Sequence, residues 1–270
     1  MKVLMLHCRY KEPGGEDLAV ASEEQLLATR GHTVLPYRRN NAEIEPLPIV
    51  QKAVLPLTTV WSNKSLAAVR HFALDHHPDV AHFHNTFPLI SPSAYSACRS
   101  AGIPVVQTLH NYRLLCPGTT LSRDGKPCER CLGKGIAWPA ARFACYRGNR
   151  TASGTVAAML AIHQILGTWT KRVDLYIALS NFARDKFIAG GLPASKIVVK
   201  PNFVHPDPGS DRNVSGYALF AGRLSAEKGL RTLLAAWKQL GSKIPLRIAG
   251  DGPLRGELEG LVQRLGLGGV

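Results

Sequence analysis

Two cations in a glycine-bounded loop, Arg223 and Lys228, have the type and spacing expected of a phosphate-binding site. The loop, 222–229, lies between an apolar run that predicts a strand, 217–221, and an expected helix over about 230–240. The N–H groups and the dipole of a helix N-terminus attract an anion, and here an arginine adds forked donors while a lysine adds a point charge. From these residues alone, a phosphate site and a solvated basic loop are the two interpretations.

Four cysteines form the second candidate site. Cys116, Cys128, Cys131 and Cys145 are spaced so that a C-x-x-C pair stands between two flanking thiols. This spacing suits tetrahedral coordination by four thiolates, the closed geometry of a structural zinc site. The intervening loop is rich in Gly, Pro, Arg and Lys and has little apolar material to order itself, so a metal would help it fold. An iron–sulfur cluster, a redox disulfide and four reduced thiols are the alternatives.

Histidines mark the ends of two predicted strands, 79–83 and 104–109. His82 and His84 alternate along the first, so they share a face and could contact a substrate or a metal. A hydrogen-bonded structural pair fits the same pattern. His110 directly follows the second strand. Because open α/β sheets bind ligands at the carboxyl ends of their strands, His82 and His84 stand where a site is expected. For His110, a strand-end histidine that only orders a loop is the alternative to a site residue.

Strands and helices alternate along the first 200 residues. Apolar runs predict six strands, at 2–8, 33–37, 79–83, 104–109, 174–178 and 197–199. Predicted helices between them include one that begins after Ser62 as its N-cap and reaches about Leu74, and others over 91–100, 155–170 and 181–189. This alternation predicts an α/β fold with an open, mostly parallel sheet.

A stretch rich in Pro, Asp, Asn and Gly, 201–216, has the composition of an exposed linker between domains. Before it, residues 1–200 form the expected N-terminal domain, which includes a Cys-rich insertion at about 112–150. After it, residues 217–270 hold two expected strands with their helices. Two strands do not make a stable sheet on their own, so we expect the start of a second domain that is cut short.

The whole segment 220–229 closely resembles the second-domain loop of the retaining glycosyltransferases of family 4. These enzymes have the two-domain GT-B fold and transfer a sugar from a nucleotide diphosphate. Further motifs match those of the family in the same order, and they are Gly14-Gly15, Leu109-His110-Asn111, Pro201-Asn202 and the segment 248–253. The resemblance covers essentially the whole chain, and the order of the motifs makes it specific.

The resemblance implies roles for the two basic residues and the glycine pair. Arg223 and Lys228 would bind the donor diphosphate and stabilise the charge that builds on the leaving nucleoside diphosphate. They would take the place of a metal ion, so catalysis would need no cofactor. Gly14 and Gly15 would let the backbone approach the donor phosphate and sugar, because they have no Cβ.

The same resemblance places His110 at the donor sugar as the catalytic residue of the first domain. His84 and Asn111 would lie beside it and bind substrate. The Cys-rich loop follows His110 directly in some members, so we expect it to be an insertion that shapes the acceptor pocket.

Complete members of the family continue for about 100 further residues, the length needed to finish a nucleotide-binding domain. That stretch contains two glutamates separated by seven residues, which contact the donor sugar and the ribose, and the present sequence does not reproduce them. A chain of this extent is therefore expected to bind the donor poorly. The alternative functions are a non-catalytic binding module or remnant, and a zinc-dependent enzyme that uses His82, His84 and the cysteines.

The net charge of the chain indicates which classes of molecule it binds. Lys and Arg outnumber Asp and Glu by 33 to 19, so the surface attracts anions such as phosphorylated substrates or lipid headgroups. The basic residues are scattered and accompany no nucleic-acid-binding motif, so nucleic acid is not expected as a partner. We expect a cytoplasmic protein that binds a nucleotide diphosphate sugar and a glycan or lipid-linked acceptor. Lys171 and Arg172, after an apolar helix, suggest peripheral contact with the inner membrane face.

Overall fold

The computed structural model describes residues 1–11, 14–209, 216–241 and 243–270. The chain divides into two units, Met1–Pro208 and Gly209–Val270. The boundary between them falls within the predicted linker, 201–216, of which residues 210–215 lie outside the described residues.

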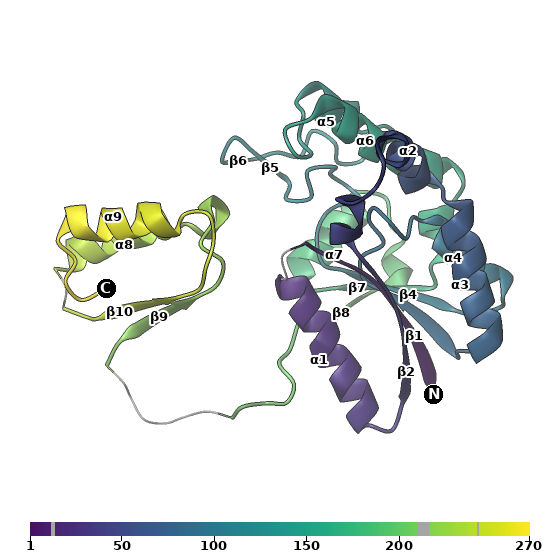
Figure 1. The fold of residues 1–270 in the computed structure, drawn as a ribbon, viewed down its shortest axis with the longest axis horizontal. Coiled ribbons are helices and arrows are strands. Elements are labelled where there is room, and N and C mark those ends of the chain that lie inside the picture. Colours follow the sequence, from purple (N-terminus) through teal and green to yellow (C-terminus); the bar gives the residue numbers. More distant parts are fainter. Residues whose placement is uncertain (12–13, 210–215, 242) are drawn as a thin grey trace. The chain divides into compact units, whose positions relative to one another are not determined.

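A parallel six-stranded sheet in the order β2-β1-β3-β4-β7-β8 forms the centre of the first unit (Figure 1). Its strands are β1 (Lys2–Arg9), β2 (Thr33–Asn40), β3 (Val80–Phe83), β4 (Val105–Leu109), β7 (Leu175–Ala178) and β8 (Ile197–Val199). All six coincide with predicted strands, and the α/β class is confirmed. The chain first adds β2 on one side of β1 and then β3 on the other, so the switch point of this sheet lies between β1 and β3.

Helices cover both faces of this sheet (Figure 1). They are α1 (Gly15–Thr29), α2 (Ile49–Val60), α3 (Asn63–His76), α4 (Ser93–Ser100), α5 (Trp138–Arg142), α6 (Arg150–Ile165) and α7 (Asn181–Ala189). Short 3-10 turns occupy Asn41–Ile44 and Ala194–Lys196, and a π-helical turn occupies Thr168–Arg172.

The alternation of side chains along β1 explains the two layers. Leu4 and Leu6 point to one face and share a core with Val69 of α3, whereas Met5 points to the other face and packs with Val20 of α1. Successive residues of a strand face opposite sides, so a strand that is apolar throughout requires helices on both. The sheet thus separates two apolar clusters, one on each of its faces.

The predicted helix over 155–170 differs from the structure at both ends. α6 begins five residues earlier, where Asn149 caps it by accepting a hydrogen bond of 2.9 Å from the Ala152 N–H. It ends at Ile165 because Gly167 adopts a left-handed conformation with φ 67°. The cap was overlooked because the basic residues around it resemble a loop.

The segment between β4 and α6 has little regular structure. It contains a hairpin of two very short strands, β5 (Ser122–Arg123) and β6 (Lys126–Pro127), and the five-residue α5. The Cys-rich region predicted as an insertion, about 112–150, lies here.

The second unit contains β9 (Ala218–Ala221) and β10 (Leu246–Ala249), paired in parallel, with α8 (Leu230–Leu240) and α9 (Arg255–Leu265). A 3-10 turn, Ala226–Lys228, precedes α8. Leu230 and Leu234 of α8 are buried with Leu246 and Leu258 in a separate small core. Within the described part of either unit, no helix combines the length and apolar character that crossing a membrane would require.

Candidate functional site

The carboxyl ends of the central strands bring together the predicted site residues of the first unit. Gly14 and Gly15 follow β1, His84 directly follows β3 and His110 directly follows β4. Lys200, which directly follows β8, reaches the same edge. Ligands of open α/β sheets bind at this edge beside the switch point, so the predicted residues stand at the expected place.

His84 and His110 contact each other directly. Nδ1 of His84 and Nε2 of His110 share a hydrogen bond of 2.9 Å. His82, two residues before His84, shares a hydrogen bond of 2.8 Å between its Nε2 and the Thr108 hydroxyl. His82 and His84 are thus hydrogen-bonded to Thr108 and His110 respectively, and the His84 ring fixes the orientation of the His110 ring.

Burial keeps these imidazoles neutral. It lowers the pKa of His82 to about 4, with a further contribution from the Lys200 charge. Burial also lowers the pKa of His110 to about 4, aided by His7, His82 and Lys200 and opposed by Asp17. The pKa of His84 falls well below its ordinary value, mainly because the ring is buried. At neutral pH each of the three rings carries one proton, which it can donate, and one nitrogen that accepts.

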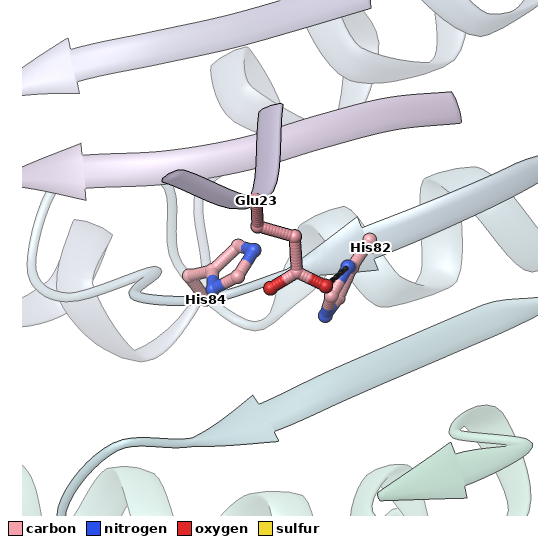
Figure 2. A group of neighbouring side chains, drawn as sticks. All are labelled: Glu23, His82 and His84. Atoms are coloured by element: carbon pink, nitrogen blue, oxygen red, sulfur yellow. Dashed lines mark ion pairs between the residues drawn. The ribbon is translucent and has the colours of Figure 1, made fainter. Parts of the chain in front are cut away.

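Glu23 of α1 lies against the histidine pair, and Figure 2 shows its carboxylate between the two rings. One ligand atom from each of Glu23, His82 and His84 lies within 4.8 Å of the others, which within the described residues makes a possible metal-binding group. However, Lys200 Nζ lies 3.4 Å from one carboxylate oxygen, and His82 Nδ1 lies 3.6 Å from the other. Lys200 therefore balances the charge of Glu23 within the protein, as a cation would.

A polar hollow of about 50 Å³ lies beside His84 and His110, and Glu16 and Arg113 also line it. Three buried atoms of its lining, Glu16 Oε1, His84 Nε2 and Arg113 Nη1, have no hydrogen-bond partner among the described residues. Buried polar atoms are almost always hydrogen-bonded in folded proteins, so three such atoms around one hollow point to a ligand or to ordered water. This feature makes the hollow the candidate site of the first unit.

The loop after β4 places Arg113 at this hollow. The side-chain oxygen of Asn111 accepts a hydrogen bond of 3.0 Å from the Arg113 N–H, which fixes the turn. The guanidinium then lies 4.1 Å from the centre of the Phe87 ring and 5.5 Å from that of Tyr146. Asn111, predicted to bind substrate, therefore has a structural hydrogen bond and also faces the hollow.

Glu16 is a site residue that the sequence analysis missed. Burial raises its pKa to about 7, against the opposing effects of the Tyr10 hydroxyl and the Arg113 charge. The Tyr10 hydroxyl donates a hydrogen bond of 3.0 Å to Oε2. The residue follows the glycine pair at the start of α1, where a glutamate is ordinary because the helix dipole favours it, so the sequence carried no signal of its burial.

The glycine pair itself has no structural reason to be glycine. Gly14 has an extended backbone and precedes α1, and a Cβ built at Gly14 or Gly15 meets no atom of the described residues within 4 Å. The carboxylate of Asp17 accepts a hydrogen bond of 2.9 Å from the Gly14 N–H. The loop before the pair includes residues 12–13, which lie outside the described residues. Open space at both positions is compatible with the close approach of a ligand.

In the second unit, Arg223 and Lys228 lie in the loop that joins β9 to α8, and both side chains are exposed. The loop is held by its own backbone, because the Lys228 N–H donates to the Ser225 carbonyl at 3.0 Å. Gly229, with φ 70°, then begins α8. The loop thus presents two cations immediately before a helix N-terminus, the arrangement predicted for phosphate binding.

A second loop, after β10, packs directly against the first. The Leu224 N–H donates to the Asp251 carbonyl at 2.9 Å, and the Leu254 N–H donates to the Leu224 carbonyl at 3.0 Å. A Cβ at Gly250 would collide with the Gly222 carbonyl oxygen, and one at Gly252 would lie 2.5 Å from the Leu224 oxygen. Only glycine lets these two loops meet, which explains the glycines in the segment 248–253.

The four cysteines line a cavity of their own. No histidine lines it, so His82 and His84 do not join the cysteines in one site, and the interpretation as a zinc enzyme using both sets is wrong.

Comparison with protein families assigns the chain. The model described as Glycosyltransferase Family 4 matches residues 20–208, which is more than half of the 270 residues. The chain belongs to glycosyltransferase family 4. The model described as Glycosyl transferases group 1 matches residues 210–270 of the same chain. The comparison with curated proteins gave no match.

Solved structures similar to this glycosyltransferase confirm the GT-B type of fold. HepE of Anabaena in complex with UDP is 21% identical, with a TM-score of 0.55 over 99% of this chain and 67% of HepE. The lipopolysaccharide outer core galactosyltransferase WaaB, in its apo form, is 15% identical, with a TM-score of 0.52 over 99% of this chain and 66% of WaaB. At these identities the similarity concerns the fold.

In this glycosyltransferase, replacing Glu16 with glutamine is expected to remove a pH-dependent loss of stability. The folded-state pKa of Glu16, about 7, lies above the ordinary value of 4.5. Protonated Glu16 therefore stabilises the fold fully below pH 4.5, and this contribution is lost as the pH rises through 7. The shift corresponds to about 3 kcal/mol. Urea denaturation measures this effect. The unfolding free energy of the parent protein minus that of Glu16→Gln is determined at acidic and at alkaline pH, and the two differences are compared.

The matched control for Glu16 is Glu259→Gln, the same substitution at an exposed site of the second unit. It should leave the pH dependence of unfolding close to that of the parent protein. If Glu16→Gln also left it unchanged, the carboxyl group would not be buried as the structure places it.

Proposed function

We propose that this protein transfers a sugar from a nucleotide diphosphate sugar to a glycan or lipid-linked acceptor, with retention of the anomeric configuration. The observation that carries the proposal is the loop of the second unit. This loop places Arg223 and Lys228 before the N-terminus of α8, and the chain matches glycosyltransferase family models. The complexes of the similar HepE with UDP, and with UDP and glucose, support a nucleoside diphosphate as the leaving group.

The two cations suit the chemistry of the leaving group. When the bond between sugar and phosphate breaks, negative charge builds on the diphosphate, and fixed positive groups that face it lower the barrier. Arg223 supplies a planar fork for two phosphate oxygens, and Lys228 supplies a compact charge. These two side chains and the helix N-terminus would neutralise the diphosphate in place of a metal ion.

The first unit would bind the sugar at the polar hollow. His110 lines it, with one ring nitrogen bonded to His84, so its other nitrogen can bond a sugar hydroxyl. Glu16 Oε1 and Arg113 Nη1 supply a carboxylate and a cation for further hydroxyls or for an acceptor. The open space at Gly14 and Gly15 supports the close approach of the donor that the family resemblance implies.

A lipid-linked acceptor is supported by exposed apolar side chains on two helices that pack together, α2 and α6. Their exposed apolar side chains are Ile49, Val50 and Leu57 on α2, and Ile162, Ile165 and Leu166 at and beyond the end of α6. Lys52, Lys171 and Arg172 add cations nearby in the chain. Exposed apolar side chains together with cations are the two signals that peripheral membrane proteins combine.

An apolar cavity beside α2 lies next to the hollow. It has a volume of about 200 Å³ and is lined by Leu55 and Pro56 of α2, with Lys52 and Arg147 as cations. Thr59 and Phe87 line both this cavity and the polar hollow. An acceptor with an apolar chain and an anionic group could therefore lie in the cavity with its reactive end at the hollow.

The alternative is a non-catalytic binding module. Incubation with UDP-, GDP- and ADP-sugars, with release of nucleoside diphosphate and product analysis by NMR, separates the two. Transfer to a polyprenyl-phosphate-linked acceptor, with the donor's anomeric configuration kept in the product, supports the proposal. If the protein binds a nucleoside diphosphate but transfers sugar from none of these donors, it is a binding module. A product with inverted anomeric configuration would refute retention.

His110→Ala is expected to lower the turnover number by about 100-fold, because a preorganised contact to the reacting sugar is lost. The exposed His71, whose side chain is 81% accessible, gives the matched control His71→Ala, which should retain full activity. Steady-state kinetics with saturating donor measure both. Equal activity of the two variants would remove His110 from the reaction.

A further inference from the structure

The middle of the segment that carries the four cysteines, residues 122–136, has few apolar contacts to order it. Between residues 111 and 149 the regular elements are a minimal hairpin and one turn and a half of helix, α5. Large apolar side chains in this segment face outward, with Ile136 60% exposed and Trp138 53% exposed. Leu115 and Leu121 join the main core, but no residue from 122 to 136 is buried, so that stretch needs another source of stability.

The backbone of the segment is also strained at several points. Thr119, Leu121, Asp124 and Ala144 all have positive φ, between 49° and 70°, although none is glycine. Such conformations are unfavourable for residues with a Cβ and persist only where surrounding structure enforces them. Each of these residues lies close in sequence to one of the cysteines, so the enforcing contacts are expected there.

All four cysteines line one cavity. Cys116, Cys128, Cys131 and Cys145 surround a volume of about 20 Å³, and none forms a disulfide. This volume is close to the ~10–15 Å³ that a single water molecule occupies by the same measure, so it suits one ion rather than a cluster of several atoms. Gly118 lies between two of them, since a Cβ there would be 3.7 Å from Cys116 Sγ and 3.4 Å from Cys145 Cβ.

Arginines surround the thiols. Arg123 and Arg130 line the cavity, and Arg123 Nη1 is buried without a hydrogen-bond partner among the described residues. Both guanidinium groups lie near the Phe143 ring, at 3.9 and 5.4 Å from its centre. A divalent ion with four thiolates carries two negative charges, which the two guanidinium groups would partly offset, since Arg123 also pairs with Asp124 at 3.3 Å. A thiolate would accept the hydrogen bond that Arg123 Nη1 can donate.

We propose that Cys116, Cys128, Cys131 and Cys145 bind one Zn²⁺ in a closed, structural four-thiolate site. Tetrahedral coordination with bonds of about 2.3 Å brings the sulfur atoms to roughly 3.8 Å from one another. Among the described residues, no three of these sulfurs lie mutually within 4.8 Å, so zinc binding requires the thiolates to move closer together. Zinc therefore draws the four thiolates inward and closes the loop.

The zinc site also fixes one wall of the polar hollow. Cys116 follows His110 by six residues, and its N–H donates to the Tyr112 carbonyl at 2.8 Å. The Tyr112 N–H in turn donates to the Thr119 carbonyl at 2.9 Å, so Arg113 is held in a loop that the first cysteine closes. Leu115 packs against Gly190, and Glu129 pairs with Lys186, which attaches the cysteine segment to α7 and the residues after it. Release of the metal loosens the wall that carries Arg113.

Metal analysis of the purified protein tests the site. One zinc per chain is expected by mass spectrometry of the metal content, and reconstitution with Co²⁺ should give the intense visible absorption of tetrahedral thiolate coordination. Cys128→Ser together with Cys131→Ser should reduce bound zinc at least tenfold. The matched control is Cys98→Ala, which changes a buried cysteine of α4 and should leave the zinc content unchanged.

A measurement on the parent protein covers the case in which the cysteine variants do not fold. Removal of zinc by a chelator should expose residues 117–149 to limited proteolysis, and added Zn²⁺ should restore protection. Iron with acid-labile sulfide, a disulfide within this set, or four thiols that react freely in metal-free folded protein would each overturn the proposal. So would zinc that is lost in His82→Ala and retained in the cysteine variants. None of these readouts depends on transferase activity.

Discussion

Replacing Lys228 with alanine is expected to lower the turnover number of sugar transfer by about 100- to 1,000-fold, the usual cost of removing one preorganised charge-stabilising group. Lys228 ends the 3-10 turn before Gly229 and α8, so its ammonium lies where a helix N-terminus already attracts an anion. The negative charge on the leaving diphosphate grows between the ground state and the transition state. The loss should therefore appear mainly in kcat, with a smaller increase in the donor KM.

The side chains of Arg223 and Lys228 are exposed, so their truncation should leave the fold and Tm of the protein unchanged. Arg223→Ala should act like Lys228→Ala, and Arg223→Lys should recover part of the activity, because it keeps the charge and loses the fork. The matched control is Lys238→Ala in the last turn of α8, which removes an exposed charge from the same unit. Equal kinetics in Lys228→Ala and Lys238→Ala would contradict diphosphate binding by this loop.

The sheet of the first unit could be predicted from local patterns because each strand is a short apolar run that ends at a turn signal. Buried parallel strands have apolar side chains on both faces, so their signal is strong and independent of partners. The start of the helix after Ser62 was equally predictable. The structure confirms it, because the Ser62 hydroxyl accepts a hydrogen bond of 3.1 Å from the Ser65 N–H. Caps of this kind depend on residues within one turn.

Helix α2 could not be predicted in the same way. It contains Pro56 in its interior and follows Pro48, and both prolines read locally as breaks in a helix. What holds α2 is its packing against α6, a contact between segments about 100 residues apart in sequence. Tertiary packing overrides local propensity here, and no single-sequence pattern reports it.

The candidate site was predictable where a residue's position along a strand decides its place. His84 and His110 directly follow neighbouring strands, so the meeting of their rings follows from the sheet order. The burial of Glu16, in contrast, depends on contacts between separate parts of the chain. Its burial depends on Tyr10 and on Arg113, which reaches it from the other side of the sheet's switch point, and such an encounter has no signature in the sequence.

The buried histidines are expected to make the protein unstable in acid. The folded-state pKa of His82 and that of His110 are each about 4, below the ordinary value of 6.5. The unfolded chain then binds more protons than the folded chain, so stability present above pH 6.5 is lost as the pH falls toward 4. Between about pH 7 and pH 5 each ring should cost about 2 kcal/mol of unfolding free energy. His84, lowered in the same direction, adds to the loss.

The double variant His82→Gln, His110→Gln isolates this effect from the opposing one of Glu16, whose raised pKa strengthens the fold over the same fall in pH. From about pH 7 to pH 5, the parent protein should lose about 4 kcal/mol more than the double variant in urea denaturation. Glu23, Lys200, His7 and Asp17 face these rings and are unchanged in both proteins. His71→Gln, at an exposed position, should behave as the parent. If the double variant lost stability in acid as steeply as the parent, the two rings would have to titrate normally, and the buried network around His84 would not be formed.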